Sequence, residues 1–185
     1  MMPPSGPATT LVADVGSDGM LEVYLVRHAV AGHADASRWP DDAERPLTAR
    51  GFRDFRAAAR GLRELVPDVG CLLSSGYARA WQTAELLHDV AGWPKPQECE
   101  ELEAERRAAS ALGLLRSRGE QSVALVGHEP YLSRLASLLC TGGEDTLRLQ
   151  LKKGAVVLVR TEPDVRPGEG RLSWSLAPKH LRLLA

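Results

Sequence analysis

Residues 21–28 read LEVYLVRH, six mostly apolar residues that end directly on Arg27 and His28. A short apolar run of this kind, rich in β-branched and aromatic residues, is typical of a buried strand. The following segment, 29–46, is small, polar and punctuated, which indicates a long loop, and loops of that length are uncommon unless they are functional. The pattern therefore predicts a buried strand whose end carries an arginine and a histidine.

Strand-like and helix-like segments alternate along the rest of the chain. Apolar residues at helical spacing predict helices over 49–66, 78–90, 105–118 and about ten residues after Pro130. Short apolar runs predict further strands over 71–74, 122–126, 155–160 and 172–176. This alternation predicts an α/β fold, a three-layer α/β/α sandwich with a mostly parallel central sheet.

The first predicted helix has the clearest start and the clearest apolar face. Thr48 is a good N-cap residue, which places the first helical residue at position 49. The apolar face is expected to consist of Phe52, Phe55, Ala59, Leu62 and Leu65.

The chain is predicted to hold one domain behind an N-terminal extension. Residues 1–19 are rich in Pro, Gly, Ser and Thr and have little periodicity, so we expect a flexible segment there. Residues 20–185 are enough for a single stable core.

Charged side chains follow three of the predicted strands at the point where each strand ends. Arg27 and His28 end the first strand, Arg79 follows the second after a short turn, and His128 follows the strand 122–126. In α/β sheets, ligands bind beyond the carboxyl ends of the strands. We therefore expect these side chains to meet at one edge of the sheet.

Two histidines and two arginines in one pocket suit phosphoryl transfer. A neutral histidine whose second ring nitrogen is held by a hydrogen bond is a competent phosphoryl acceptor. The arginine fork binds phosphoryl oxygens through two parallel hydrogen bonds, and a helix N-terminus at Arg79 adds free N–H groups. His128 is expected to be a second charged donor. Each residue alone is more often structural: a solvated strand end, a surface helix residue or a helix cap.

The composition excludes several other classes of protein. The formal net charge of −1 provides no basic field for nucleic acid. The cysteines are odd in number and widely spaced, which argues against a disulfide framework or a zinc site; they are Cys71, Cys99 and Cys140. Residues 1–7 lack the features of a signal peptide, and no segment approaches the roughly 20 apolar residues that span a bilayer. We expect a cytoplasmic protein without metal, cofactor, nucleic-acid or membrane partner; the oligomeric state stays open.

Four short motifs follow one another along the chain. They are Arg27-His28-Ala29, Arg45-Pro46-Leu47-Thr48 with Gly51, SGYARAWQT at 75–83, and Val126-Gly127-His128-Glu129-Pro130. In this order and spacing they resemble the motifs of the histidine phosphatase (phosphoglycerate mutase-like) superfamily. The last motif and the tail Trp174-x-Leu176-x-Pro178 are similar to its SixA-like phosphohistidine phosphatase branch. The resemblance covers about residues 21–185.

The resemblance implies roles for the matching positions. It implies that His28 is the nucleophile. The other catalytic and phosphate-binding residues that it implies are Arg27, Arg79, His128 and Arg45. Two positions depart from the family's pattern. Ala29 replaces the usual glycine, which is tolerated if its φ is negative, and Gly76 replaces the usual proline, so that turn is expected to be looser.

The position of the general acid also departs from the family's pattern. Many relatives carry a glutamate two residues after a leucine, and here the residue two positions after Leu102 is Ala104. Glu101, Glu103 and Glu105 surround it, either as candidates for the acid or as a solvated acidic face. An alkoxide leaving group needs a proton, whereas the imidazole of a phosphoramidate departs more easily. The missing glutamate therefore favours phosphohistidine substrates.

The leading hypothesis is a metal-independent phosphatase that acts on protein phosphohistidine, as in phosphorelay signalling, through phosphorylated His28. A phosphomonoesterase or mutase acting on a small phosphorylated substrate is the alternative within the superfamily. Two alternatives come from other classes: an inactive module that binds phosphate or phosphoprotein, and a metal site at His28, His33 and His128.

Overall fold

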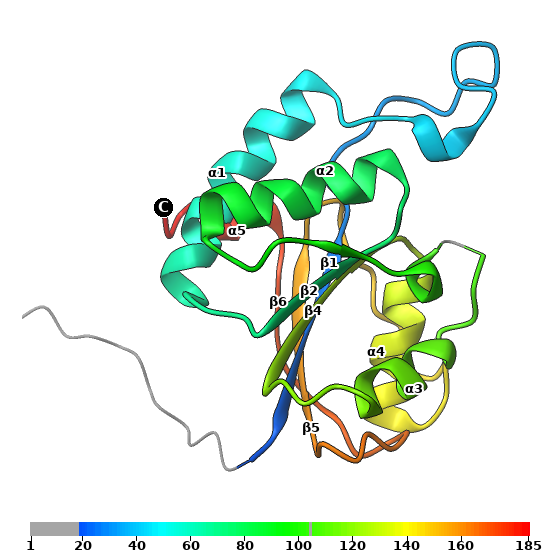
Figure 1. Ribbon diagram of the computed structural model, residues 1–185, viewed down its shortest axis with the longest axis vertical. Coiled ribbons are helices and arrows are strands. Elements are labelled where there is room, and N and C mark those ends of the chain that lie inside the picture. The colour runs from blue at the N-terminus through cyan, green and yellow to red at the C-terminus, as the bar shows by residue number, and fades with distance from the viewer. Residues whose placement is uncertain (1–18, 104) are drawn as a thin grey trace, which may run out of the picture.

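The computed structural model describes residues 19–103 and 105–185 (Figure 1). The predicted N-terminal extension, residues 1–19, lies outside the described residues apart from Gly19. Ala104, which occupies the position of the family's general acid, also lies outside them.

A six-stranded sheet forms the middle of the molecule, in the order β3-β2-β4-β1-β5-β6 (Figure 1). Its strands are β1 (Leu21–Arg27), β2 (Cys71–Ser74), β3 (Gln97–Glu98), β4 (Ser122–Gly127), β5 (Val156–Thr161) and β6 (Arg171–Leu176). The pairs β1–β4, β4–β2 and β2–β3 are parallel, whereas β5 runs antiparallel to both β1 and β6. The predicted mostly parallel sheet is confirmed.

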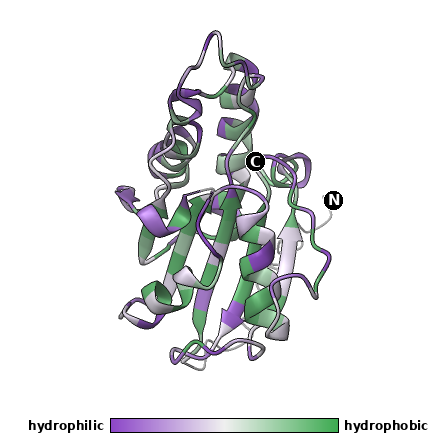
Figure 2. Cartoon of the chain, turned by 90° about the vertical axis from the view of Figure 1, so that its right-hand side faces the viewer, coloured by the Kyte–Doolittle hydropathy of each residue, from purple (hydrophilic) through white to green (hydrophobic). Residues whose placement is uncertain are grey.

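Helices cover both faces of this sheet, so the predicted three-layer architecture is also confirmed (Figure 1). One face carries α1 (Ala49–Leu65), α2 (Ala78–Leu86) and α5 (Pro178–Leu181). The other carries α3 (Ser110–Arg116) and α4 (Tyr131–Thr141). β1 and β4 are buried on both faces, which explains why their sequences are almost continuously apolar (Figure 2).

Helix α1 begins where it was predicted, because the Thr48 hydroxyl accepts a hydrogen bond from the N–H of Gly51 (2.9 Å). Gly51 lies so close to the backbone of Val30 that a Cβ there would clash with the Val30 carbonyl oxygen. The apolar face was partly wrong, since Phe52 and Leu65 are 43% and 41% exposed. The buried face of the helix contains Gly51. Phe52 is the next residue and therefore lies about 100° around the helix from that face.

Several shorter elements differ from the sequence prediction. The helix predicted over 105–118 is wrong in extent, since α3 covers only Ser110–Arg116. Residues 105–109 form turns and bends instead of a helix, and Ala108 packs into the core there. The helix predicted over 78–90 consists of α2 followed by a π-helical turn, η2 (Leu87–Ala91). β3 and α5 were not predicted, because they are too short to show a periodic pattern.

Candidate functional site

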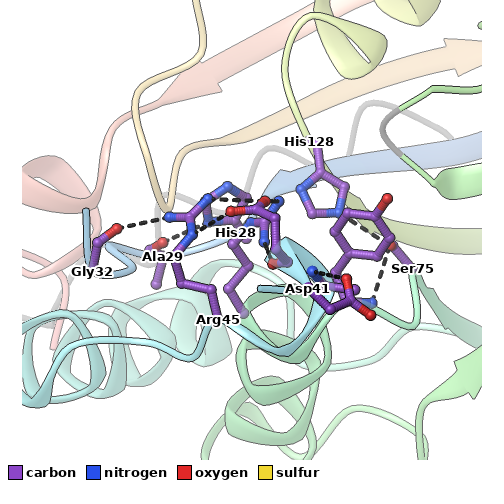
Figure 3. Close-up of polar contacts among 11 residues, drawn as sticks. His28, Ala29, Gly32, Asp41, Arg45, Ser75 and His128 are labelled. Atoms are coloured by element: carbon purple, nitrogen blue, oxygen red, sulfur yellow. Dashed lines mark hydrogen bonds and ion pairs between the residues drawn. The ribbon is translucent and has the colours of Figure 1, made fainter. Parts of the chain in front are cut away.

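The ends of β1 and β4 bring two histidines together. His28 directly follows β1, and its backbone N–H donates to the carbonyl of Gly127 at the end of β4 (3.0 Å). His128 is the next residue after β4, and its ring centroid lies 5.2 Å from that of His28 (Figure 3). Both side chains are buried, with 6% and 2% exposure. The parallel pairing of β1 and β4 thus creates a site at the carboxyl edge of the sheet.

The ring of His28 is fixed in one tautomer by its neighbour. Its Nδ1 lies 2.7 Å from the carbonyl oxygen of Ala29. Because a carbonyl only accepts, Nδ1 must carry the proton, which leaves the lone pair on Nε2. Burial lowers the pKa of His28 to about 3, against the opposing effect of this hydrogen bond, and the charges of Arg79 and Arg27 lower it further. The ring is therefore neutral at neutral pH.

The backbone around Ala29 accounts for the departure from the usual glycine. Among the described residues no non-glycine residue has a positive φ, so Ala29 meets the condition expected for it. Its N–H donates to the hydroxyl of Thr83 (3.0 Å), and that hydroxyl donates to the carbonyl of Arg79 (2.7 Å). Helix α2 is thereby linked to the chain directly after His28.

The two predicted arginines of the site are held by carbonyl oxygens. Arg27 donates from Nη1 to the carbonyl of Leu151 (2.6 Å), and Arg79 donates from Nη1 to the carbonyl of Asp42 (2.7 Å). The Arg79 guanidinium also lies 5.0 Å from the ring centroid of Tyr77. Within the described part of the chain, the buried Nε atoms of both arginines have no hydrogen-bond partner. These N–H groups are donors that an anion in the site could use.

His128 is neutral in this structure, which corrects the expectation of a charged donor. Burial lowers its pKa to about 3, and the charge of Arg79, together with that of His28 whenever its ring is protonated, acts in the same direction. Its Nε2 lies 3.0 Å from the hydroxyl of Ser75, and its ring packs 4.9 Å from that of Tyr77. The buried Nδ1 has no partner among the described residues.

Asp42 is a site residue that sequence reasoning missed. It opens the 3-10 turn η1 (Asp42–Glu44) in the loop between β1 and α1. Its Oδ2 lies 3.0 Å from Nη2 of Arg79, and its carboxylate accepts from Nε (2.7 Å) and Nη2 (3.2 Å) of Arg45. The hydrogen bond from Arg45 is the main cause that lowers the pKa of Asp42. The sequence signal that could have identified Asp42 was its position three residues before Arg45.

Arg45 therefore reaches the same site as the other predicted residues. Besides its two bonds to Asp42, it donates from Nη1 to the carbonyl of Gly32 (2.7 Å; Figure 3). These contacts fold the long loop back over the end of the sheet. The segment 29–46 thus carries part of the site, as the assignment of Arg45 to substrate binding requires.

The turn before Arg79 does not need the family's usual proline. A Cβ built at Gly76 would clash with the carboxylate of Glu98, which packs over the turn from the end of β3. The Ser75 hydroxyl accepts from the N–H of Tyr77 (3.3 Å) inside the same turn. The space beside Gly76 is therefore filled by a side chain from the neighbouring strand.

The three glutamates considered as the general acid differ in their surroundings. The Cys99 thiol donates to the carboxylate of Glu101 (3.1 Å), and this bond is the main cause that lowers the pKa of Glu101. Glu103 and Glu105 carry charges that add to burial in raising the pKa of Tyr77. Burial raises the pKa of Glu129, and its carboxyl group interacts with the charge of Arg27. Glu101 is thus engaged by a thiol, whereas Glu103 and Glu105 act on Tyr77, which packs against His128.

The alternative metal site is not formed. Over residues 19–103 and 105–185, no group of three or more His, Cys, Asp or Glu side chains lies close enough to hold a metal ion. His33 is exposed in the loop, whereas His28 and His128 are buried. Among the helices of the described chain, none is long and apolar enough to cross a membrane.

Comparisons with known proteins extend over most of the chain. Residues 23–104 match the family described as histidine phosphatase superfamily (branch 1). An uncharacterized protein of Picosynechococcus is 31% identical over 144 residues, which cover 76% of this chain and 86% of that protein. The phosphohistidine phosphatase SixA of Escherichia coli is 26% identical over 170 residues, or 88% of this chain and 98% of SixA.

A solved structure shows the same fold. The protein histidine phosphatase SixA, in complex with tungstate, superposes on this chain with a TM-score of 0.76 at 25% sequence identity. The match covers 87% of this chain and 99% of that one. The likeness therefore extends over most of the chain.

Proposed function

The chain belongs to the histidine phosphatase superfamily, in its SixA-like branch, and we propose that it hydrolyses protein phosphohistidine through a covalent intermediate on His28. The observation that carries the proposal is the hydrogen bond between Nδ1 of His28 and the Ala29 carbonyl. It leaves a lone pair on Nε2 of a neutral, buried ring, which is the form that a nucleophilic histidine needs.

The first step transfers the phosphoryl group to His28. Its Nε2 forms the new P–N bond while the bond from phosphorus to the substrate's imidazole nitrogen breaks. The electron pair of that bond stays on the departing imidazole, which takes a proton from solvent. Nδ1–H continues to donate to the Ala29 carbonyl, and this stabilises the positive charge that the His28 ring acquires.

The second step returns the enzyme to its starting state. Water attacks the phosphorus of phosphorylated His28, the P–N bond breaks, and its electron pair returns to Nε2. The water molecule gives up a proton, so the products are inorganic phosphate and neutral His28. No other group is consumed in the cycle.

Positive charge and buried donors support a phosphoryl group in this pocket. The Nε atoms of Arg27 and Arg79 and Nδ1 of His128 are buried, and among the described residues none has a partner. When the Ser75 hydroxyl donates to Nε2 of His128, Nδ1 carries the proton and becomes a donor. Such donors suit the charge on the equatorial oxygens of a transferred phosphoryl group.

Two observations favour phosphohistidine over an alkyl phosphate as the substrate. Glu101 has a lowered pKa and accepts from Cys99, so it is a poor proton donor at neutral pH. Imidazole leaves without the general acid that an alkoxide requires. The names of relatives point the same way, because SixA is called a phosphohistidine phosphatase and a protein histidine phosphatase.

Trapping the intermediate tests the nucleophile. His28→Ala should lower kcat/KM by more than about a hundredfold, because alanine offers no nucleophile. Rapid acid-free quenching with labelled substrate should trap an alkali-stable, acid-labile phosphoryl enzyme in the wild type only. His33→Ala is the control, since His33 is exposed in the loop and should leave both readouts unchanged. A labelled phosphoryl enzyme in His28→Ala would overturn the assignment.

Substrate preference tests the leaving group. A phosphohistidine peptide should exceed alkyl and sugar phosphates in kcat/KM by about 10²–10⁴, the contribution of a missing general acid. The comparison is repeated in Glu101→Gln, Glu103→Gln, Glu105→Gln and Glu129→Gln. Strong sugar-phosphate activity that disappears in one of these variants would identify a general acid. The protein would then be a phosphomonoesterase of small substrates.

A further inference from the structure

Lys153 lies at the corner of a tight turn that is anchored to His28. The turn 152–155 is closed by a hydrogen bond from the N–H of its last residue to the carbonyl of its first (2.8 Å). Gly154, with φ of +76°, occupies the third position, which in a type II turn requires a positive φ. The N–H of Gly154 donates to the carbonyl of His28 (3.0 Å). The backbone of Lys153 is therefore held beside the proposed nucleophile.

Lys153 also lines a cavity of about 80 Å³ that adjoins the site. Ala29, whose carbonyl binds the His28 ring, forms part of the same lining. Phe55 and Pro178 supply apolar walls, and Arg182 contributes a second cation. Since a water molecule takes about 30 Å³, this space is large enough for a small polar group.

The charge of Lys153 is not balanced by the protein. Burial is the main cause that lowers the pKa of Lys153, and the charges of Arg27, Arg45 and Arg79 lower it further. Across residues 19–103 and 105–185, no carboxylate forms an ion pair with Lys153. Asp54 belongs to the cavity lining, but its carboxylate lies 3.5 Å from Nε of Arg50. A ligand carboxylate would therefore meet an ammonium group that has no competing partner.

We propose that Lys153 and this cavity form a subsite that binds a carboxylate carried by the substrate beside its phosphoryl group. The inference rests on the proposed function, because that function sets the phosphoryl group at His28. An ammonium group is a compact charge with three donors, which suits a carboxylate that approaches on a flexible side chain. The carboxylate belongs either to a Glu or Asp that flanks phosphohistidine or to a small phosphorylated acid.

Binding of stable phosphonates tests the subsite without turnover. Calorimetry compares phosphonoacetate with ethylphosphonate and 3-phosphonopropionate with propylphosphonate, because the members of each pair differ by a carboxylate. The wild type should bind the acid of at least one pair about tenfold more tightly, which corresponds to one additional ion pair of about 1.4 kcal/mol. Lys153→Met should abolish this preference while it changes alkylphosphonate affinity less than about twofold.

The matched control is Lys152→Met, which removes the same charge one residue earlier in the turn. Lys152 does not line the cavity, so this variant should keep the preference for the acids. A preference that survives in Lys153→Met, or that both variants lose equally, would overturn the subsite.

Peptides distinguish the two sources of the carboxylate and separate this proposal from the proposed function. Phosphohistidine peptides with Glu or Gln beside the phosphohistidine are compared by kcat/KM. Lys153→Met should raise KM about tenfold for the Glu peptide only, with kcat kept. A phosphonate preference without peptide turnover would reject phosphohistidine as substrate and leave the subsite in place. Peptide turnover with phosphonate binding indifferent to Lys153 would reject the subsite alone.

Discussion

Arg79 binds through two nitrogens at once, which a lysine cannot reproduce. Its Nη1 donates to the carbonyl of Asp42, and its Nη2 contacts the carboxylate of the same residue. Arg79→Lys keeps the charge but replaces a planar fork by a point charge. We expect kcat/KM to fall at least about tenfold. Steady-state kinetics with Arg53→Lys, an exposed arginine of α1, as the control would check this; equal kinetics in the two variants would show that the fork is dispensable.

The η1 turn brings a carboxylate to two arginines of the proposed phosphate pocket, so the loop competes with the substrate. Asp42 is half exposed and contacts both Arg79 and Arg45. Asp42→Asn should bind inorganic phosphate more tightly, by about two- to fivefold, the typical strength of a partly exposed ion pair. It should also lower kcat, because the two guanidinium groups lose the contact that orients them. The inhibition constant of phosphate and kcat are measured together.

Glu44→Gln is the control for that change in the η1 turn. It removes the same charge two residues later, and the Glu44 side chain is exposed. Weaker phosphate binding in Asp42→Asn than in Glu44→Gln would mean that Asp42 supports the anion site and does not compete with it.

The elements also explain how much of the site could be predicted. The apolar runs of β1 and β4 stop just before His28 and His128, and Arg79 follows β2 after a short turn. Because parallel strands end at a common edge, the meeting of these residues followed from the sequence. Asp42 and Lys153 lie on loops, where tertiary hydrogen bonds decide the position. The bond from Gly154 to the His28 carbonyl has no periodic signature, and neither has the pairing of Asp42 with Arg79. Within helix α1, the exposed Phe52 likewise shows that apolar spacing alone does not decide which side chains are buried.

At the scale of the whole molecule, the two buried histidines link the site to the stability of the fold. Burial lowers the pKa of both His28 and His128 to about 3, whereas an unfolded histidine titrates near 6.5. Between these values the unfolded chain binds protons that the folded chain does not. The free energy of unfolding should therefore fall as the pH falls below about 6.5, and the histidines should contribute no slope above it.

Urea unfolding between pH 5 and 7.5 would measure this slope. Each histidine contributes at most about 1.4 kcal/mol per pH unit. His128→Gln should make the slope shallower by up to that amount, because glutamine does not titrate. His33→Gln should leave the slope unchanged, since His33 is exposed. An unfolding free energy that is flat from pH 7 to pH 5 in the wild type would mean that the folded protein protonates these rings, and His28 would then lack its lone pair at mildly acidic pH.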